Sequence, residues 1–143
     1  MAMQQDYKFQ QLQNSLEKTL KEWSNTEFTF DRDCVTFTLT YYRDLTGVDV
    51  LHLFNGMYNS REEAIKWLED RNYTNIDEAV TDILGLTPKP AIEAKYGDLV
   101  SFYFNDIQAL GVCKGARAYF VAYDNKDYLK VPIRKCKTAW SVN

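Results

Sequence analysis

The hydrophobic period of this chain changes once, at a short connector that contains Pro88 and Pro90. Before the connector, apolar residues recur at steps of three and four, which places them on one face of a helix. After it, apolar and polar residues alternate, as they do in strands that are buried on one face. Helices followed by antiparallel strands make an α+β fold. We therefore expect a single domain over residues 1–143.

The helical part divides into an N-terminal helix within residues 1–25 and further helices within 26–85. Four helices are expected, and the later ones start after residues that can cap a helix, namely Asp33, Ser60 and Asn75. The connector, 86–96, is predicted to be a crossing loop, and the sheet part covers 97–143. About five strands are expected there, at 99–104, 109–114, 118–123, 128–133 and 138–142.

The bulk composition excludes several classes of protein. The chain of 143 residues is 45% hydrophobic and 15% aromatic, too apolar for a disordered segment. With a net charge of −3, it shows no basic footprint for nucleic acid. We expect no membrane insertion and no signal peptide, because no apolar run is long enough and the N-terminus lacks the required regions. Three cysteines without a CxxC pair, and one histidine, predict no disulfide framework, metal site or cofactor.

Cys34 is the leading candidate for chemistry. It follows Asp33, a possible helix cap, so its thiol should lie on the first turn of a helix, where the partial positive charge favours the thiolate. A cysteine nucleophile also needs a base, usually a histidine. The only histidine is His52, within a short helix expected after Asp49, and we regard it as an unlikely base. The plainer reading is that Cys34 is a small buried residue, and Cys113 and Cys136 are expected to fill the core in the same way.

Carboxylates offer a second, weaker candidate. Asp33, Asp98 and Asp106 are suitable residue types for metal or acid–base work. Their plainer roles are helix cap, strand start and turn, and we favour those roles.

Several short motifs occur in an order that resembles a known family. The thiol motif, a Gly-Asp strand and a strand ending in Gly-Val are similar to NlpC-type, papain-like cell-wall peptidases. A longer series resembles small phage and prophage proteins related to those peptidases, and it covers the chain from about Trp23 to the end. The motifs are Trp23, Asp33-Cys34, Thr46-Gly47-Val48-Asp49, Gly56-Met57-Tyr58, Gly97-Asp98, Ala109-Leu110-Gly111-Val112 and Trp140-Ser141-Val142.

The resemblance implies a papain-like arrangement, with the helix that begins at Cys34 packed on the sheet. In active members the second strand carries the histidine base, and by that register the position here is Ala109. Alanine cannot transfer a proton, and the loss of a general base lowers the rate by about 10²–10⁴-fold. The resemblance therefore implies an inactive scaffold on which Cys34 is a relic.

Three functions remain open at this point. The leading one, implied by the resemblance, is a structural component of a tailed-phage tail tip or baseplate. Such a protein would be assembled in the host cytoplasm into the virion, with hub and other tail proteins as partners. Its many tyrosines suit protein interfaces. The alternatives are an active cysteine hydrolase that cleaves peptidoglycan peptides, and a small binding module with no viral role.

Overall fold

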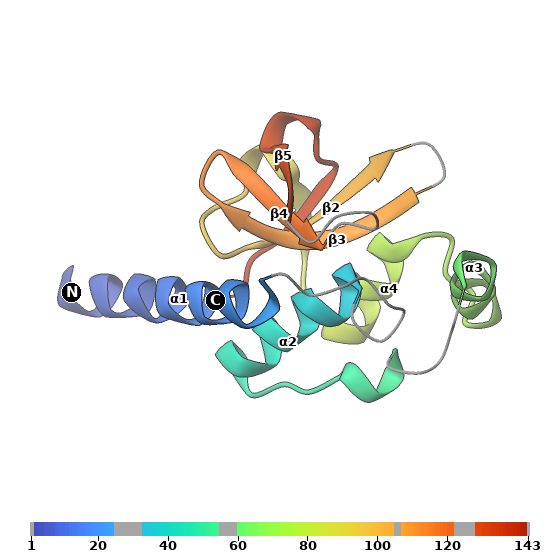
Figure 1. Ribbon diagram of the computed structural model, residues 1–143, viewed down its shortest axis with the longest axis horizontal. Helices are drawn as coiled ribbons and strands as arrows, with labels where there is room; N and C mark the ends of the chain where they lie inside the picture. The colour runs from blue at the N-terminus through green and yellow to red at the C-terminus, as the bar shows by residue number, and fades with distance from the viewer. Residues whose placement is uncertain (1, 25–32, 55–59, 105–106, 122–127, 143) are drawn as a thin grey trace.

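The computed structural model describes residues 2–24, 33–54, 60–104, 107–121 and 128–142. Figure 1 shows an α+β fold with the helices on one side of a curled antiparallel sheet. The helices are α1 (Ala2–Trp23), α2 (Cys34–Thr46), α3 (Arg61–Asp70) and α4 (Ile76–Leu84). The strands are β1 (Pro88–Pro90), β2 (Leu99–Phe104), β3 (Ile107–Lys114), β4 (Arg117–Val121), β5 (Tyr128–Pro132) and β6 (Thr138–Trp140). Three short 3-10 turns complete the set: η1 (Leu51–Leu53), η2 (Ala91–Glu93) and η3 (Ile133–Lys135).

The sheet has six described strands in the order β1-β6-β2-β3-β4-β5. The prediction of about five strands within 97–143 missed β1, because the connector 86–96 is not only a crossing loop. Its residues 88–90 pair with β6, and Lys89 lies opposite Ala139. Proline cannot donate to a strand ladder and is therefore confined to edges. As an edge strand, β1 tolerates Pro88 and Pro90 on either side of Lys89.

The helix ends follow the cap residues that the sequence contains. Asp33 caps α2, and its side chain accepts a hydrogen bond from the Thr36 backbone N–H. Ser60 and Asn75 cap α3 and α4 in the same way. The starts of these three helices are thus confirmed. The predicted end of the first helix at residue 25, and the predicted strand residues 122–123, lie outside the described residues.

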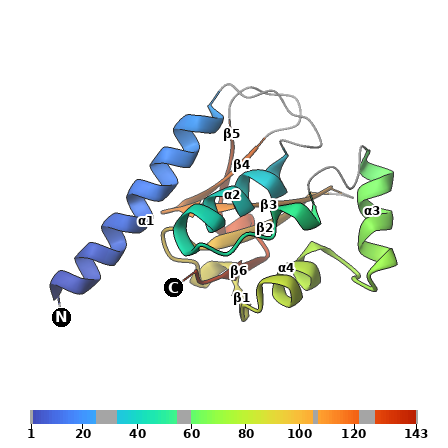
Figure 2. The same cartoon turned by 90° about the horizontal axis from the view of Figure 1, so that it is seen from below.

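Two buried clusters lie on the two faces of the sheet. On β2, Leu99 belongs to the cluster under the helices, whereas its neighbour Val100 belongs to the cluster on the other face. This division follows from the alternation of side chains along a strand. Viewed from below, α2 lies in front of the sheet, α1 runs along the left, and α4 and α3 lie toward the right (Figure 2). No helix within the described residues is both long enough and apolar enough to cross a bilayer.

Candidate functional site

The start of α2 is fixed by a capping box. The Asp33 carboxylate accepts the Thr36 N–H at 2.9 Å, and the Thr36 hydroxyl accepts the Asp33 N–H at 2.9 Å. Both residues are almost fully buried. A reciprocal cap of this kind satisfies two backbone donors that the helix leaves open. It fixes the orientation of the first turn and therefore the position of Cys34.

The Cys34 sulfur faces strand β3. It accepts a hydrogen bond from the Leu110 backbone N–H at 3.4 Å. One helical turn further on, the Thr38 hydroxyl donates to the Leu110 carbonyl oxygen at 3.0 Å. A single residue of β3 is thus held by two side chains from the same face of α2.

The register of the sheet explains why the backbone N–H and C=O of Leu110 are available to α2. Strand β4 pairs with β3 from Val112, opposite Tyr119, to Lys114, opposite Arg117. Leu110 lies beyond that pairing, and the N–H and C=O of one strand residue point to the same side. Buried backbone groups need partners. On this side of β3, Cys34 and Thr38 of α2 take the place of a neighbouring strand.

Gly111 lies at the point where β4 crosses closest to β3. A β-carbon on this residue would lie 2.3 Å from the Tyr119 carbonyl oxygen and 2.6 Å from the Phe120 ring. Only glycine fits such an approach. The close approach of β4 therefore explains the glycine in the Ala-Leu-Gly-Val motif.

The protonation of Cys34 differs from the sequence-based expectation. Burial raises the pKa of the Cys34 thiol to about 12, and the nearby Asp33 carboxylate adds to the increase. The Leu110 N–H and the N–H groups of the first helical turn lower the pKa, but by less than burial raises it. Part of the residue remains open to solvent, yet its sulfur contacts β3. The prediction that the helix start favours a thiolate was therefore wrong, because desolvation outweighs the helix field.

Ala109 stands directly before Leu110, at the position where the resemblance places a base. Its methyl group is 9% exposed and belongs to the apolar cluster on the face of the sheet away from the helices. Phe120 is a member of this cluster, and Phe102 and Cys34 pack against it. Cys34 thus packs against an apolar cluster of which Ala109 is a member.

His52 lies elsewhere. It is exposed on η1, which Figure 1 shows beneath α2, on the opposite side from the sheet. No hydrogen bond among the described residues joins His52 to Cys34. The structure places Asp33 beside the thiol and Ala109 in the apolar cluster that Cys34 packs against, and no described hydrogen bond links His52 to either.

Asp98 is part of a polar cluster that the sequence analysis missed. The Lys89 ammonium pairs with the Asp98 carboxylate at 2.7 Å and donates to the Ser141 hydroxyl at 2.8 Å. Asp98 also accepts the Lys95 N–H at 2.9 Å. The cluster ties β1, the start of β2 and the end of β6 together. No sequence signal pointed to it, because its three side chains are up to 52 residues apart.

The other carboxylates do not assemble into a metal site in the part of the chain that is described. No group of three or more His, Cys, Asp or Glu side chains there is arranged to hold an ion. Asp106 lies outside the described residues. Cys113 is buried in the same apolar cluster as Ala109, as predicted for a core residue.

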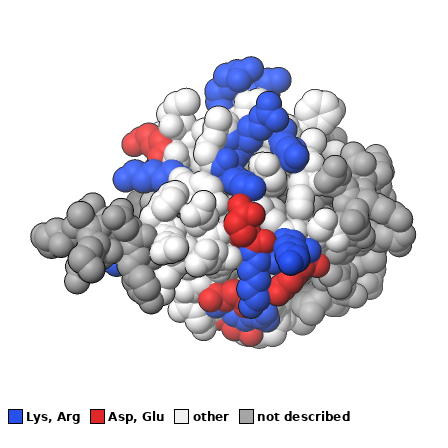
Figure 3. Space-filling view, turned by 60° about the vertical axis from the view of Figure 1, so that its left-hand side comes forward, with Lys and Arg blue, Asp and Glu red and all other residues white. Residues whose placement is uncertain are grey.

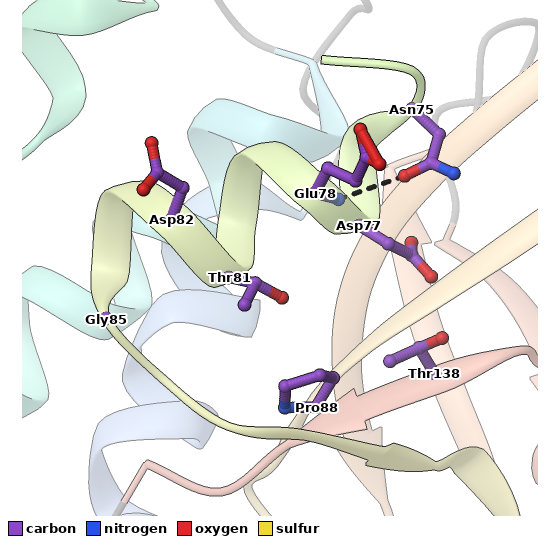
Figure 4. A pocket seen from close by; sticks show the side chains of 8 residues that line it. All are labelled: Asn75, Asp77, Glu78, Thr81, Asp82, Gly85, Pro88 and Thr138. Atoms are coloured by element: carbon purple, nitrogen blue, oxygen red, sulfur yellow. Dashed lines mark hydrogen bonds between the residues drawn. The ribbon is translucent and has the colours of Figure 1, made fainter.

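An open hollow of about 640 Å³ lies between α4 and the β1–β6 edge (Figure 4). Asp77 and Thr81 point toward the strands, whereas Glu78 and Asp82 point away. The two inward groups already have protein partners, since Tyr103 donates to Asp77 at 2.8 Å and Trp140 donates to Thr81 at 3.1 Å. These two bonds hold α4 on the sheet. We therefore interpret the hollow as the boundary between α4 and the sheet.

Comparison with protein families identifies one match over almost the whole chain. Residues 7–142 match a family described as a domain of unknown function, DUF6950. The chain belongs to this family. No curated protein matches it. The matched residues include α2, the strands of the sheet and Cys34.

Proposed function

We propose that this DUF6950 chain is a non-catalytic structural protein built on a papain-like, NlpC-type scaffold. The observation that carries the proposal is the state of Cys34. Its sulfur is engaged by the Leu110 N–H, its pKa is raised to about 12, and the position where the resemblance implies a base is Ala109. A thiol that keeps its proton, with no imidazole bonded to it among the described residues, is a poor nucleophile.

The arrangement of the elements supports the papain-like part of the proposal. The helix that begins at Cys34 packs on β3, and the motif Ala109-Leu110-Gly111-Val112 is the segment that meets it. The Gly-Asp motif precedes β2, next to β3. Gly97 has a φ of +88°, and its carbonyl accepts the Tyr41 hydroxyl at 2.8 Å. This placement of the motifs on α2, β2 and β3 supports the proposed scaffold.

Most motif positions also have a role in the architecture. Asp33 caps α2, Gly47 ends it with a φ of +81°, and Asp49 accepts the Leu51 N–H at 3.0 Å. Trp140 is fully buried. The Gly56-Met57-Tyr58 motif lies outside the described residues. A motif set that builds the fold is compatible with a protein that has lost its chemistry, because fold and site depend on different residues.

The place of action that we propose is the tail tip or baseplate of a tailed phage, with hub and other tail proteins as partners. This part rests on the resemblance to phage and prophage proteins. An inactive scaffold suits it, because a virion component needs a stable shape and binding surfaces.

The first test measures catalysis and thiol state together. Peptidoglycan treated with the purified protein should stay intact, and Cys34→Ala should behave identically. Labelling of native Cys34 by iodoacetamide should remain slow up to about pH 9, where an unperturbed thiol is largely ionised. Unfolded protein serves as the reference for the free thiol. Peptidoglycan cleavage that disappears in Cys34→Ala would establish the alternative, an active cysteine hydrolase.

The second test concerns location. Purified virions from a lysogen that encodes the chain should contain it at fixed stoichiometry to tail proteins. Particles made without the gene should lack normal tails. A chain that stays in the lysate, with complete and infectious virions, would contradict the tail role and leave the non-catalytic reading of Cys34 intact.

A further inference from the structure

Charge is separated between the two halves of the molecule. The described residues from β3 to β6 carry six cations and no carboxylate: Lys114, Arg117, Lys130, Arg134, Lys135 and Lys137. The segment 60–85, which contains α3 and α4, carries seven carboxylates and only three cations. A net charge of −3 for the whole chain conceals this separation.

Within these regions, α3 and the β3–β4 turn lie at opposite ends of the molecule. In Figure 1, α3 stands at the right-hand end of the long axis, and the β3–β4 turn lies on the left. Figure 3 brings that left side forward, and Lys and Arg side chains dominate the upper part of its surface. Within one copy, the charges of α3 therefore lie on the opposite side from those at the β3–β4 turn.

The outer side of α3 combines charge with an exposed apolar residue. Ile65 is 39% exposed. Glu62 and Glu69 lie three residues before it and four after it, which places all three on one helix face. Neither Glu62 nor Glu69 forms an ion pair with a described residue. We call these three residues the α3 face.

The opposite end carries a matching surface. The Lys114 and Lys130 ammonium groups lie 5.3 and 5.4 Å from the centre of the Tyr119 ring. Arg117 is exposed on the same strand as Tyr119. Lys114 pairs with Glu17 at 3.1 Å, but Arg117 and Lys130 form no ion pair within the described part of the chain. We call these four residues the basic end.

We propose that the α3 face of one copy docks on the basic end of a second copy. Ile65 would pack on the partly exposed Tyr119 ring, and Glu62 and Glu69 would meet Arg117 and Lys130. Because the two surfaces differ, the contact is heterologous and leaves one of each kind free on the pair. Copies would therefore add head to tail until a ring closes or a filament forms.

Sedimentation velocity of the full chain tests the contact. Mass should rise with protein concentration at about 0.05 M salt and fall back to the monomer at about 0.5 M, where exposed charges are screened. Charge reversal at either surface, by E62K/E69K or by R117E/K130E, should weaken association at least about tenfold, because like charges would then face each other. Phe104→Ser serves as the control, since Phe104 is 59% exposed but belongs to neither surface.

A mixture of the two double variants gives the sharper result. Each alone should stay monomeric, while the mixture should associate, because reversed α3 faces then meet reversed basic ends. Circular dichroism confirms that both variants fold. A wild-type chain that stays monomeric at every concentration would overturn the proposal, as would association that survives both reversals. Binding of a DNA oligonucleotide, lost in R117E/K130E without any self-association, would instead assign the basic end to a polyanion and also overturn it.

Discussion

Helices α2 and α3 have similar N-terminal caps but differ in how much of each helix is buried. Asp33 and Ser60 each accept a hydrogen bond from a backbone N–H three residues further on. In α2, seven of 13 residues are buried, whereas α3 buries only Trp67 and Leu68 among its ten. Local sequence determines where both helices start, and tertiary contacts decide what each one does. Side chains of α2 bond to the backbone of β3, whereas most residues of α3 are exposed.

The contrast extends to the polar groups of the two helices. The thiol of Cys34 and the hydroxyl of Thr38 are both bonded to one residue of β3. On α3, Glu62 and Glu69 are exposed, and neither forms an ion pair with a described residue. Substitutions should therefore change stability at the α2 seam, and association rather than stability at α3.

The largest effect is expected at Gly111, beneath the start of α2. Gly111→Ala would place a carbon 2.3 Å from the Tyr119 carbonyl oxygen, and we expect a loss of about 3 kcal/mol in the free energy of unfolding. Gly115→Ala is the matched control, because Gly115 has a φ of +85° but open space, so only about 1 kcal/mol of backbone strain is expected. Urea unfolding measures both. Equal losses would mean that β4 does not approach β3 as closely as described.

Thr38→Val is expected to come next. The variant keeps the shape of the side chain but leaves the buried Leu110 carbonyl without its donor, which costs about 2 kcal/mol. Thr40→Val is the control within the same helix, because the Thr40 hydroxyl bonds only to Thr36 one turn back, and its loss should stay within about 0.5 kcal/mol. If the two variants unfold at the same urea concentration, the Thr38 bond contributes nothing to the seam.

The smallest effect is expected on α3. Glu69→Gln removes an exposed charge and should change the free energy of unfolding by less than about 0.5 kcal/mol. Its association at low salt should nevertheless weaken, since Glu69 belongs to the α3 face. Hydrogen exchange should also show faster exchange of amides in α3 than in α2, which has more buried contacts. Slow exchange throughout α3 would remove the contrast between the two helices.

Much of the fold follows from local signals. Caps at Asp33, Ser60 and Asn75 and the alternation after residue 97 predicted the helix starts and the β2–β6 strands. Strand β1 was missed, because its three residues include two prolines and its pairing with β6 joins segments about 50 residues apart. No local pattern reports such a pairing.

The candidate site was predicted in position but not in chemistry. The sequence placed Cys34 on the first turn of a helix and Ala109 on the second predicted strand. It could not show that the sulfur meets the Leu110 N–H, because that contact depends on where β4 leaves β3. The contact with β3 buries the sulfur, and burial raises the pKa of the thiol. The expectation of a thiolate, which was drawn from the helix start alone, is therefore reversed.

The position of β6 has a consequence for synthesis on the ribosome. This strand is the last in order along the chain, yet it lies between β1 and β2. Lys89 of β1 meets Ser141 just after β6. A nascent chain can pair β2 with β3 early, but β1 has to wait for a neighbour that is translated about 50 residues later. The emergence of β6, rather than formation of the helices, therefore completes the sheet.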